Sequence, residues 1–216
     1  HGQCEAFMDG VIEQMRNETV NKSTSMTFER LIPQYTLFHM KNCIYHKNIE
    51  QLRQALEPYD VADMPCIVVA AGPSLDKNIQ QLKQIQGKAF VIVVDAALRT
   101  VVKAGVRPDL VCTVDARSPE RFFEGVDLTD VIWAYTRTTR RAIAEDHGTD
   151  VFYYGTFYRK WNERLKEELG YSIPSFASGG SVSCEAFVIG LYLGFRTIIL
   201  MGQDLAFTGG QSHTKE

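Results

Sequence analysis

Two short glycine turns stand out because each is followed by a stretch with the character of a helix. Their residues are Gly72, Pro73, Ser74 and Leu75 in the first, and Ser178, Gly179, Gly180 and Ser181 in the second. Glycine lets the backbone bend sharply and lets a ligand approach it closely. The free amides at a helix start suit an anionic group. Both turns therefore indicate a phosphate-type site, although a helix cap at Ser74 or Ser181 with close packing remains the alternative.

Polar side chains follow three apolar runs of the chain. Asp95 ends AFVIVVD and Asp115 ends LVCTVD, whereas Gln203 and Asp204 follow TIILMG. Carboxylates at neighbouring strand ends can hold ribose hydroxyls, a base amine or a magnesium ion, and a helix cap is the alternative for each aspartate. His213 lies in the glycine-rich loop that follows, where an imidazole can act as a base or simply be solvated.

The elements that must position these residues begin near Pro65. Apolar runs rich in β-branched residues alternate there with segments of helical character, at 66–71, 89–95, 110–115, 131–136, 151–155 and 197–202. Continuously apolar strands are buried on both faces, and such alternation gives parallel strands with right-handed crossovers. We expect an α/β fold with a doubly wound, mostly parallel Rossmann-like sheet. The glycine turns and acids then share its carboxyl edge, and Asp109, ahead of its strand, is a turn residue at the opposite edge.

The first part of the chain has a different character. Residues 1–60 contain no convincing strand and show helical spacing, so we predict that residues 1–62 form a helical lead-in that packs on the α/β domain or on a partner. Residues 63–216 are expected to form a nucleotide- or nucleotide-sugar-binding domain. Because the sequence stops in the polar stretch GGQSHTKE, we expect it to be a fragment of a longer protein.

Composition narrows the class of protein. The chain has 216 residues, 45% of them hydrophobic, and a formal net charge of −3, which is typical of an ordinary globular protein. This charge gives no bulk attraction to nucleic acid or an anionic membrane, and no apolar run has the length of a membrane span. The five cysteines are odd in number and widely spaced without a CxxC pair. They favour a reducing cytoplasm over disulfides or zinc.

Three segments together carry a family resemblance. GPSLD, VVDAALRTVVKAGVRPDLVCTVD and SGGSVSCEAFVIGLYLGFRTIILMGQDLAFTGGQSH resemble the bacterial motility accessory factor (Maf) family, whose central domain is also described as similar to archaeal 6-hydroxymethylpterin diphosphokinase. The resemblance runs from about Met64 to His213. The same end segments look like bacterial sialyltransferases that use CMP-activated nonulosonic acids. The resemblance implies a cytoplasmic transferase that moves pseudaminic, legionaminic or a similar acid from CMP to Ser or Thr of flagellin.

The resemblance also implies roles for the candidate residues. CMP would lie between the two glycine turns and near Gln203, with Asp95 and Asp115 close to the ribose, base or sugar. His213 would take the proton of the acceptor hydroxyl, and Asp204 would position the loop or the acceptor. The sequence lacks a DxD motif, so we expect no metal or other cofactor beyond the CMP-sugar donor.

Two other functions remain open at the level of sequence. A diphosphokinase-like pyrophosphoryl transferase would use ATP and magnesium, with Asp95 and Asp115 as metal ligands. A non-catalytic nucleotide-binding assembly module would use its helical lead-in to contact other proteins. Metal-independent binding of CMP favours the glycosyltransferase, whereas magnesium-dependent binding of ATP favours the diphosphokinase.

Overall fold

The computed structural model describes residues 31–140, 151–155, 163, 166–168, 170, 173–176 and 180–205. The strands within these residues are β1 (Lys47–Asn48), β2 (Pro65–Val69), β3 (Phe90–Val94), β4 (Leu110–Thr113), β5 (Ile132–Tyr135), β6 (Val151–Tyr153) and β7 (Thr197–Met201). The helices are α2 (Leu31–Tyr45), α3 (Ile49–Leu56), α4 (Leu75–Gln84), α5 (Asp95–Lys103), the 3-10 helix η1 (Glu120–Phe122) and α8 (Val182–Tyr192). Strand and helix alternate as the sequence predicts.

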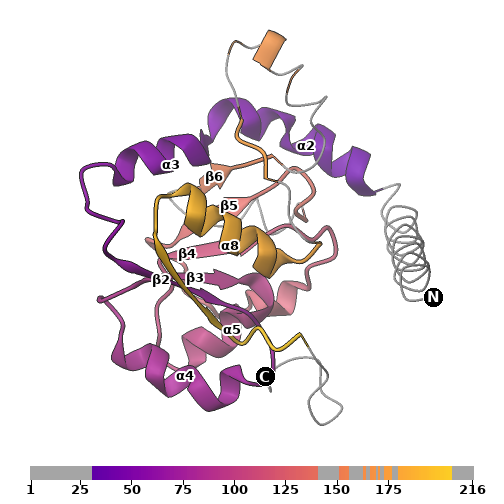
Figure 1. Cartoon of the computed structure of the whole chain (residues 1–216). Helices are drawn as coiled ribbons and strands as arrows, with labels where there is room; N and C mark the ends of the chain where they lie inside the picture. The colour runs from indigo at the N-terminus through magenta and orange to yellow at the C-terminus, as the bar shows by residue number, and fades with distance from the viewer. Residues whose placement is uncertain are drawn as a thin grey trace, which may run out of the picture.

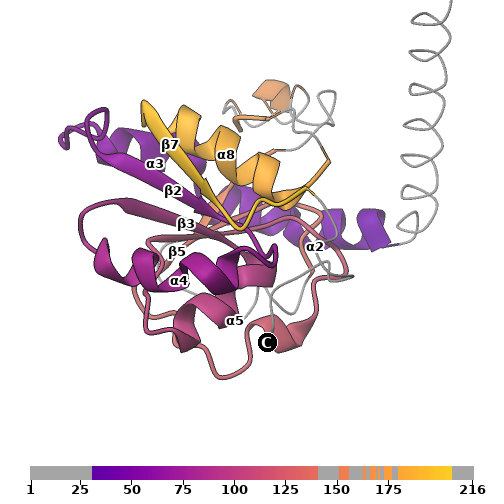
Figure 2. The same ribbon diagram turned by 60° about the horizontal axis from the view of Figure 1, so that its bottom comes forward.

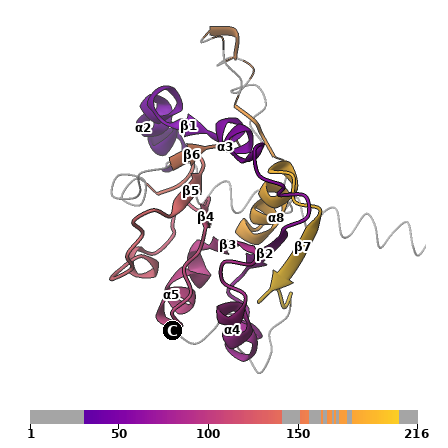
Figure 3. The ribbon, with the colours of Figure 1, turned by 90° about the vertical axis from the view of Figure 1, so that its left-hand side faces the viewer.

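The strands form one parallel sheet in the order β1-β6-β5-β4-β3-β2-β7. The chain moves from β2 through β3, β4 and β5 to β6, and then returns through α8 to β7 on the other side of β2. Helices α4 and α5 cover one face of the sheet and α8 covers the other (Figure 1 and Figure 3). This arrangement confirms the doubly wound, Rossmann-like fold, and its order reverses at β2, where such folds bind ligands.

Each of the six predicted apolar runs contains a strand. The side chains of β4 are all buried, and those of β2 and β3 are buried after the first residue. Burial on both faces is the reason that these strands read as continuous apolar runs rather than as alternating patterns. Strand β7 is the exception, because it is equally apolar but largely exposed.

The lead-in adds a strand to the sheet, and here the prediction of no strand in residues 1–60 was wrong. Strand β1 has only two residues and pairs in parallel with β6, so it is too short to leave a pattern in the sequence. Its Asn48 begins α3 with a capping box, in which the Asn48 side chain accepts the N–H of Gln51. Ile49 and Leu52 of α3 are buried in the main core. The lead-in therefore packs on the α/β domain.

Two histidines, His39 in helix α2 and His46 directly after it, contact the end of β5 and the loop that follows. The buried His39 lies with its Nε2 2.8 Å from the carbonyl oxygen of Thr139, and His46 Nδ1 lies 2.5 Å from the hydroxyl of Tyr135. These contacts hold the loop after β5 against the lead-in. Among the helices that the structure describes, none combines the length and the apolar character that a membrane span requires.

Candidate functional site

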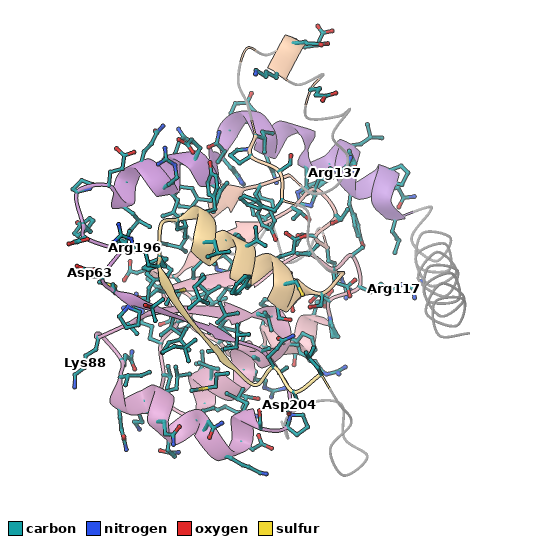
Figure 4. All side chains as sticks on the ribbon, in the orientation of Figure 1. Asp63, Lys88, Arg117, Arg137, Arg196 and Asp204 are labelled. Atoms are coloured by element: carbon teal, nitrogen blue, oxygen red, sulfur yellow. The ribbon has the colours of Figure 1, made fainter. Side chains whose placement is uncertain are left out.

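The carboxyl edge of the sheet carries the predicted site residues. Helices α4 and α5 begin directly after β2 and β3, and α8 must also begin at this edge because it returns the chain to the start of β7. In Figure 4, Asp204 and Arg117 lie at the carboxyl edge, whereas Asp63, Lys88 and Arg196 lie at the opposite edge. Three helix N-termini therefore point their amides toward one side of the molecule.

The first glycine turn is fixed against the end of β7. The N–H of Gly72 donates to the carbonyl oxygen of Gly202 at 2.7 Å. A Cβ on Gly72 would lie 2.4 Å from that same oxygen. Gly202 has φ +70°, and a Cβ there would lie 2.1 Å from the carbonyl oxygen of Ala70. Both glycines are thus required by close backbone contact between the ends of β2 and β7.

The structure confirms Ser74 as the residue before α4, but its side chain does not cap the helix. It occupies the N-cap position without a side-chain cap bond. Its N–H donates to Asp204 Oδ2 at 2.7 Å, and its hydroxyl donates to the other oxygen of the same carboxylate. These bonds lower the pKa of Asp204. Asp204 therefore positions the first turn across the β2–β7 junction.

The same contacts use up several amides of the first turn. The N–H groups of Gly72 and Ser74 have the partners described above, and the N–H of Leu75 donates to the carbonyl of Gly72 at 3.0 Å. An anion at this turn would compete with the carboxylate of Asp204. Because Pro73 has no N–H and the other three amides have partners, the first turn has little backbone hydrogen-bonding capacity left for an anion.

The second glycine turn is more open. Gly180 is exposed, has φ +83°, and has no atom of the described chain within 4 Å of the position that a Cβ would take. Ser181 is the N-cap of α8, as the sequence suggested, and its hydroxyl accepts the N–H of Cys184 at 3.4 Å. Ser183 Oγ lies 2.7 Å from Ser181 Oγ. The Cys184 N–H is already used, so the amides of Val182 and Ser183, which have no acceptor within the helix, and the two hydroxyls are the groups that this turn can offer to an anion.

Part of the predicted site lies outside the described residues. Ser178 and Gly179 of the second turn and His213, the predicted base, belong to this part. Their roles stay predictions.

The two strand-end acids have different surroundings. Asp95 is only 4% exposed and accepts hydrogen bonds from Thr113 Oγ1 at 3.0 Å, from the Ser118 hydroxyl and from the Ala96 N–H at 2.8 Å. Burial raises the pKa of Asp95, and the nearby charge of Asp115 adds to this. Asp95 therefore faces the protein interior, where it joins the ends of β3 and β4.

Asp115 is the accessible acid of the pair. Its side chain is exposed, and its Oδ1 accepts the N–H of Arg117 at 2.8 Å. The structure thus brings Asp95 and Asp115 together, but only Asp115 presents its carboxylate to solvent. Within the described residues no group of three or more His, Cys, Asp or Glu side chains could hold a metal ion.

The sequence analysis missed a cationic turn at this edge. Directly after β5, the segment TRTTR places Arg137 in a buried position and Arg140 beside Ser118, whose carbonyl oxygen accepts from Arg140 Nη1 at 3.3 Å. Thr138 and Thr139 hold the turn by donating to the carbonyl oxygens of Val114 and Thr113. The sequence does contain a signal for this turn, a cluster of arginine and threonine at the end of a strand. It was missed because the segment has no glycine, which was the residue used to find the other two turns.

The opposite edge carries a pocket of about 350 Å³. Its lining residues are Gln86, Gly87, Phe90, Arg107, Pro108, Asp109, Asp130 and Ile132. Asp109 sits in the turn before β4, as predicted, and accepts the N–H of Val91 at 2.8 Å. It stays accessible to solvent, but crowding by protein atoms raises the pKa of its carboxyl group. None of the predicted site residues lines this pocket.

Comparison with solved structures supports the fold. The Maf glycosyltransferase from Magnetospirillum magneticum AMB-1 matches with a TM-score of 0.56 and 24% sequence identity. The match covers 71% of this chain and 25% of that chain, so the chain spans about a quarter of that protein. Comparison with curated proteins gives no match.

Comparison with protein families identifies the chain. The sequence model of the family described as 6-hydroxymethylpterin diphosphokinase MptE-like matches residues 36–210. These residues include both glycine turns, every strand of the sheet and Asp204. The chain therefore belongs to the 6-hydroxymethylpterin diphosphokinase MptE-like family.

Proposed function

We propose that this chain is the donor-binding domain of a bacterial cytoplasmic glycosyltransferase that moves a nonulosonic acid from CMP to Ser or Thr of flagellin. The observation that carries the proposal is the open N-terminus of α8, where Gly180, Ser181 and Ser183 leave room for an anion at the carboxyl edge of the sheet. The fold shared with a Maf glycosyltransferase supports it.

The chemistry of such a donor suits this edge. The CMP phosphate leaves with developing negative charge, which the α8 amides and the Ser181 and Ser183 hydroxyls stabilise. Arg117 and Arg137 give the same edge positive charge, which favours a donor that carries both a phosphate and a sugar carboxylate. The exposed carboxylate of Asp115 is placed to accept hydrogen bonds from the ribose hydroxyls.

The first turn has a supporting role in this proposal. Because its amides already have partners, it contacts the donor through side chains and shape, and Asp204 keeps it in place. His213 is proposed as the base that accepts the proton of the acceptor hydroxyl. No metal is required, since amides, hydroxyls and guanidinium groups supply the charge compensation.

A second candidate is a diphosphokinase-like transferase of ATP and magnesium, which the family description favours. It needs carboxylate oxygens for the metal. Asp115 fits that need, but both oxygens of Asp95 already accept hydrogen bonds from Thr113, Ser118 and Ala96. Metal binding by Asp95 would have to displace these donors, so its surroundings fit magnesium poorly.

Calorimetric titration separates the two candidates. We expect CMP to bind without magnesium, and Gly180→Val to weaken that binding by about tenfold or more. Gly87→Val is the matched control, because Gly87 also has φ near +77° in open space but lies at the opposite edge. Binding of ATP only with magnesium assigns the diphosphokinase. Equal weakening of CMP binding by both variants contradicts a site at α8.

A transfer assay separates catalysis from binding alone. In the full-length protein, His213→Ala is expected to abolish sugar transfer to flagellin while CMP affinity stays within about twofold. Unchanged sugar transfer in this variant would show that His213 is not the base. A non-catalytic module instead predicts that flagellin glycosylation in cells stays intact when His213, Asp95 and Asp115 are all replaced with Ala, although the purified protein transfers no sugar.

A further inference from the structure

The pocket at the amino edge of the sheet takes no part in the proposed donor site. It lies where β3, β4 and β5 begin, and Figure 2 shows α4 running back along the sheet to this side. Its volume of about 350 Å³ is in the range of small-molecule sites. Its lining combines an apolar wall with a few charged or polar side chains, which is the usual composition of a site for a small organic molecule.

The apolar wall consists of Phe90, Pro108 and Ile132. Pro108 is buried, whereas Phe90 and Ile132 are only partly covered by the protein. The ring of Phe90 stacks on that of Phe195, with 5.0 Å between the ring centroids and 30° between the ring planes. Packing therefore fixes the Phe90 ring, and the uncovered parts of Phe90 and Ile132 can contact the aliphatic part of a ligand.

Asp109 supplies a carboxylate oxygen that the fold does not use. Its Oδ2 accepts the N–H of Val91 at 2.8 Å, whereas its Oδ1 accepts no hydrogen bond from any residue that the structure describes. Loss of solvation among the surrounding protein atoms raises the pKa of this carboxyl group. A cation at the unused oxygen would stabilise the charged form of Asp109, so the pocket favours a ligand of positive charge.

The other two charged groups of the lining are paired with each other. Arg107 Nη2 lies 3.4 Å from Asp130 Oδ2 and donates to the carbonyl oxygen of Thr129 at 3.0 Å. The charge of Arg107 is also near enough to lower the pKa of Asp109 slightly, but no hydrogen bond joins these two side chains in the described part of the chain. The two aspartates and one arginine leave the lining with a net negative charge, which comes from Asp109.

We propose that this pocket binds a small organic cation, an alkylguanidinium or alkylammonium compound, with its charged group on Asp109 Oδ1 and its aliphatic part on Phe90 and Ile132. The charged group would form a charge-assisted hydrogen bond with the carboxylate. Gln86 also lines the pocket, and its side-chain amide has no hydrogen-bond partner among the described residues, so its oxygen can accept a second N–H of the ligand. This site is separate from the N-terminus of α8 and does not depend on what binds there.

A titration with n-butylguanidinium chloride, followed by backbone amide NMR shifts, tests the site. We expect a dissociation constant of about 1 mM and the largest shifts at Gly87, Asp109 and Asp130. Butyrate, the matched anionic probe, should bind at least about tenfold more weakly. Equal or tighter binding of butyrate, or no shift at these residues with either probe, overturns the proposal. Binding of N-acetylarginine amide about tenfold tighter than that of n-butylguanidinium would assign the pocket to an arginine of a partner protein instead.

Asp109→Asn tests the contact with the charged group. Asparagine keeps an oxygen that can accept the Val91 N–H, so the link between β3 and β4 can persist while the affinity for n-butylguanidinium falls by about tenfold or more. Asp63→Asn is the matched control, because Asp63 is exposed at the same edge (Figure 4) but does not line the pocket. Equal loss of affinity in both variants would indicate general attraction to a negative surface and contradict a defined site.

Arg107→Gln tests the sign of the ligand's charge without altering Asp109. Because this substitution removes the competing cation and releases the Asp130 carboxylate, n-butylguanidinium should bind about threefold or more tightly. Arg107 is exposed, so the variant is expected to fold normally. Weaker binding in Arg107→Gln would make the guanidinium itself the ligand contact, and the proposal would fail.

Discussion

The two edges of this sheet differ in the direction of their helices, and this difference is our reason for proposing the ligand site at the carboxyl edge rather than at the pocket. At the carboxyl edge α4, α5 and α8 begin, so amides and positive dipole ends gather there beside Asp115 and Arg117. At the amino edge a pocket of about 350 Å³ is present, but α4 and α5 end on that side, with carbonyl groups outward. We therefore expect the proposed anionic donor to bind at the carboxyl edge, although the other edge has a pocket.

One aspartate at each edge, the buried Asp95 and the more accessible Asp109, links neighbouring strands. Asp95 joins the ends of β3 and β4 through hydroxyl donors, and Asp109 joins their beginnings through the N–H of Val91. Burial raises the pKa of both carboxyl groups. Both acids thus hold neighbouring strands together, and the acid with an open carboxylate at the proposed site is Asp115.

The largest effect is expected from crowding the β2–β7 junction. Gly202→Ala should lower the free energy of unfolding by about 3 kcal/mol or more, because the added Cβ meets the Ala70 carbonyl and also adopts positive φ. Gly87→Ala at the amino edge adds positive-φ strain alone and should cost about 1–2 kcal/mol. Urea denaturation measures both. Equal losses would show that the backbone contact at Gly202 is unimportant.

A smaller effect is expected in the pH dependence of stability. Because the pKa of Asp95 is raised from 3.8 in the folded protein, its folding contribution is present below about pH 4 and is lost as pH rises through the raised pKa. In the Asp95→Asn variant, the free energy of unfolding should therefore fall less as the pH rises above about 4. Asp109→Asn should change the profile in the same direction but less, since Asp109 stays accessible to solvent.

Unfolding measured across pH 3 to 8, about the range where carboxylates titrate, checks this pair. An Asp95→Asn profile parallel to that of the unaltered protein would contradict the burial of a carboxyl group at this position. If Asp109→Asn changed the pH dependence of stability more than Asp95→Asn does, the pKa of the acid at the amino edge would be the more strongly raised, contrary to our expectation.

The smallest effect is expected at the cap of α8. The Ser181 hydroxyl accepts the Cys184 N–H at a long 3.4 Å, so Ser181→Ala should cost only about 0.5 kcal/mol. Ser183→Ala, at the second residue of the helix, is the control and should lower the free energy of unfolding by less. A loss of several kcal/mol for Ser181→Ala, measured by thermal unfolding, would show that the hydroxyl serves the fold more than a ligand.

The sheet could be predicted from the sequence because buried parallel strands leave long apolar runs, as β3 and β4 do. Strand β1 could not, since two residues carry no period. The start of α8 directly after Ser181 could also be predicted, because the serines and glycines there are followed at once by an apolar stretch of helical character. The partner of Ser74 was not, because Asp204 lies 130 residues away and only the fold brings it near. Arg137 was overlooked because no glycine marks its turn.

The central claim is that a nucleotide binds at the N-terminus of α8. The most direct test is to record backbone amide NMR shifts during titration with CMP. We predict that the shifts concentrate at Gly180, Ser181 and Ser183, with smaller changes near Asp115. Shifts confined to the amino-edge pocket, at Gly87 and its neighbours, would contradict the claim.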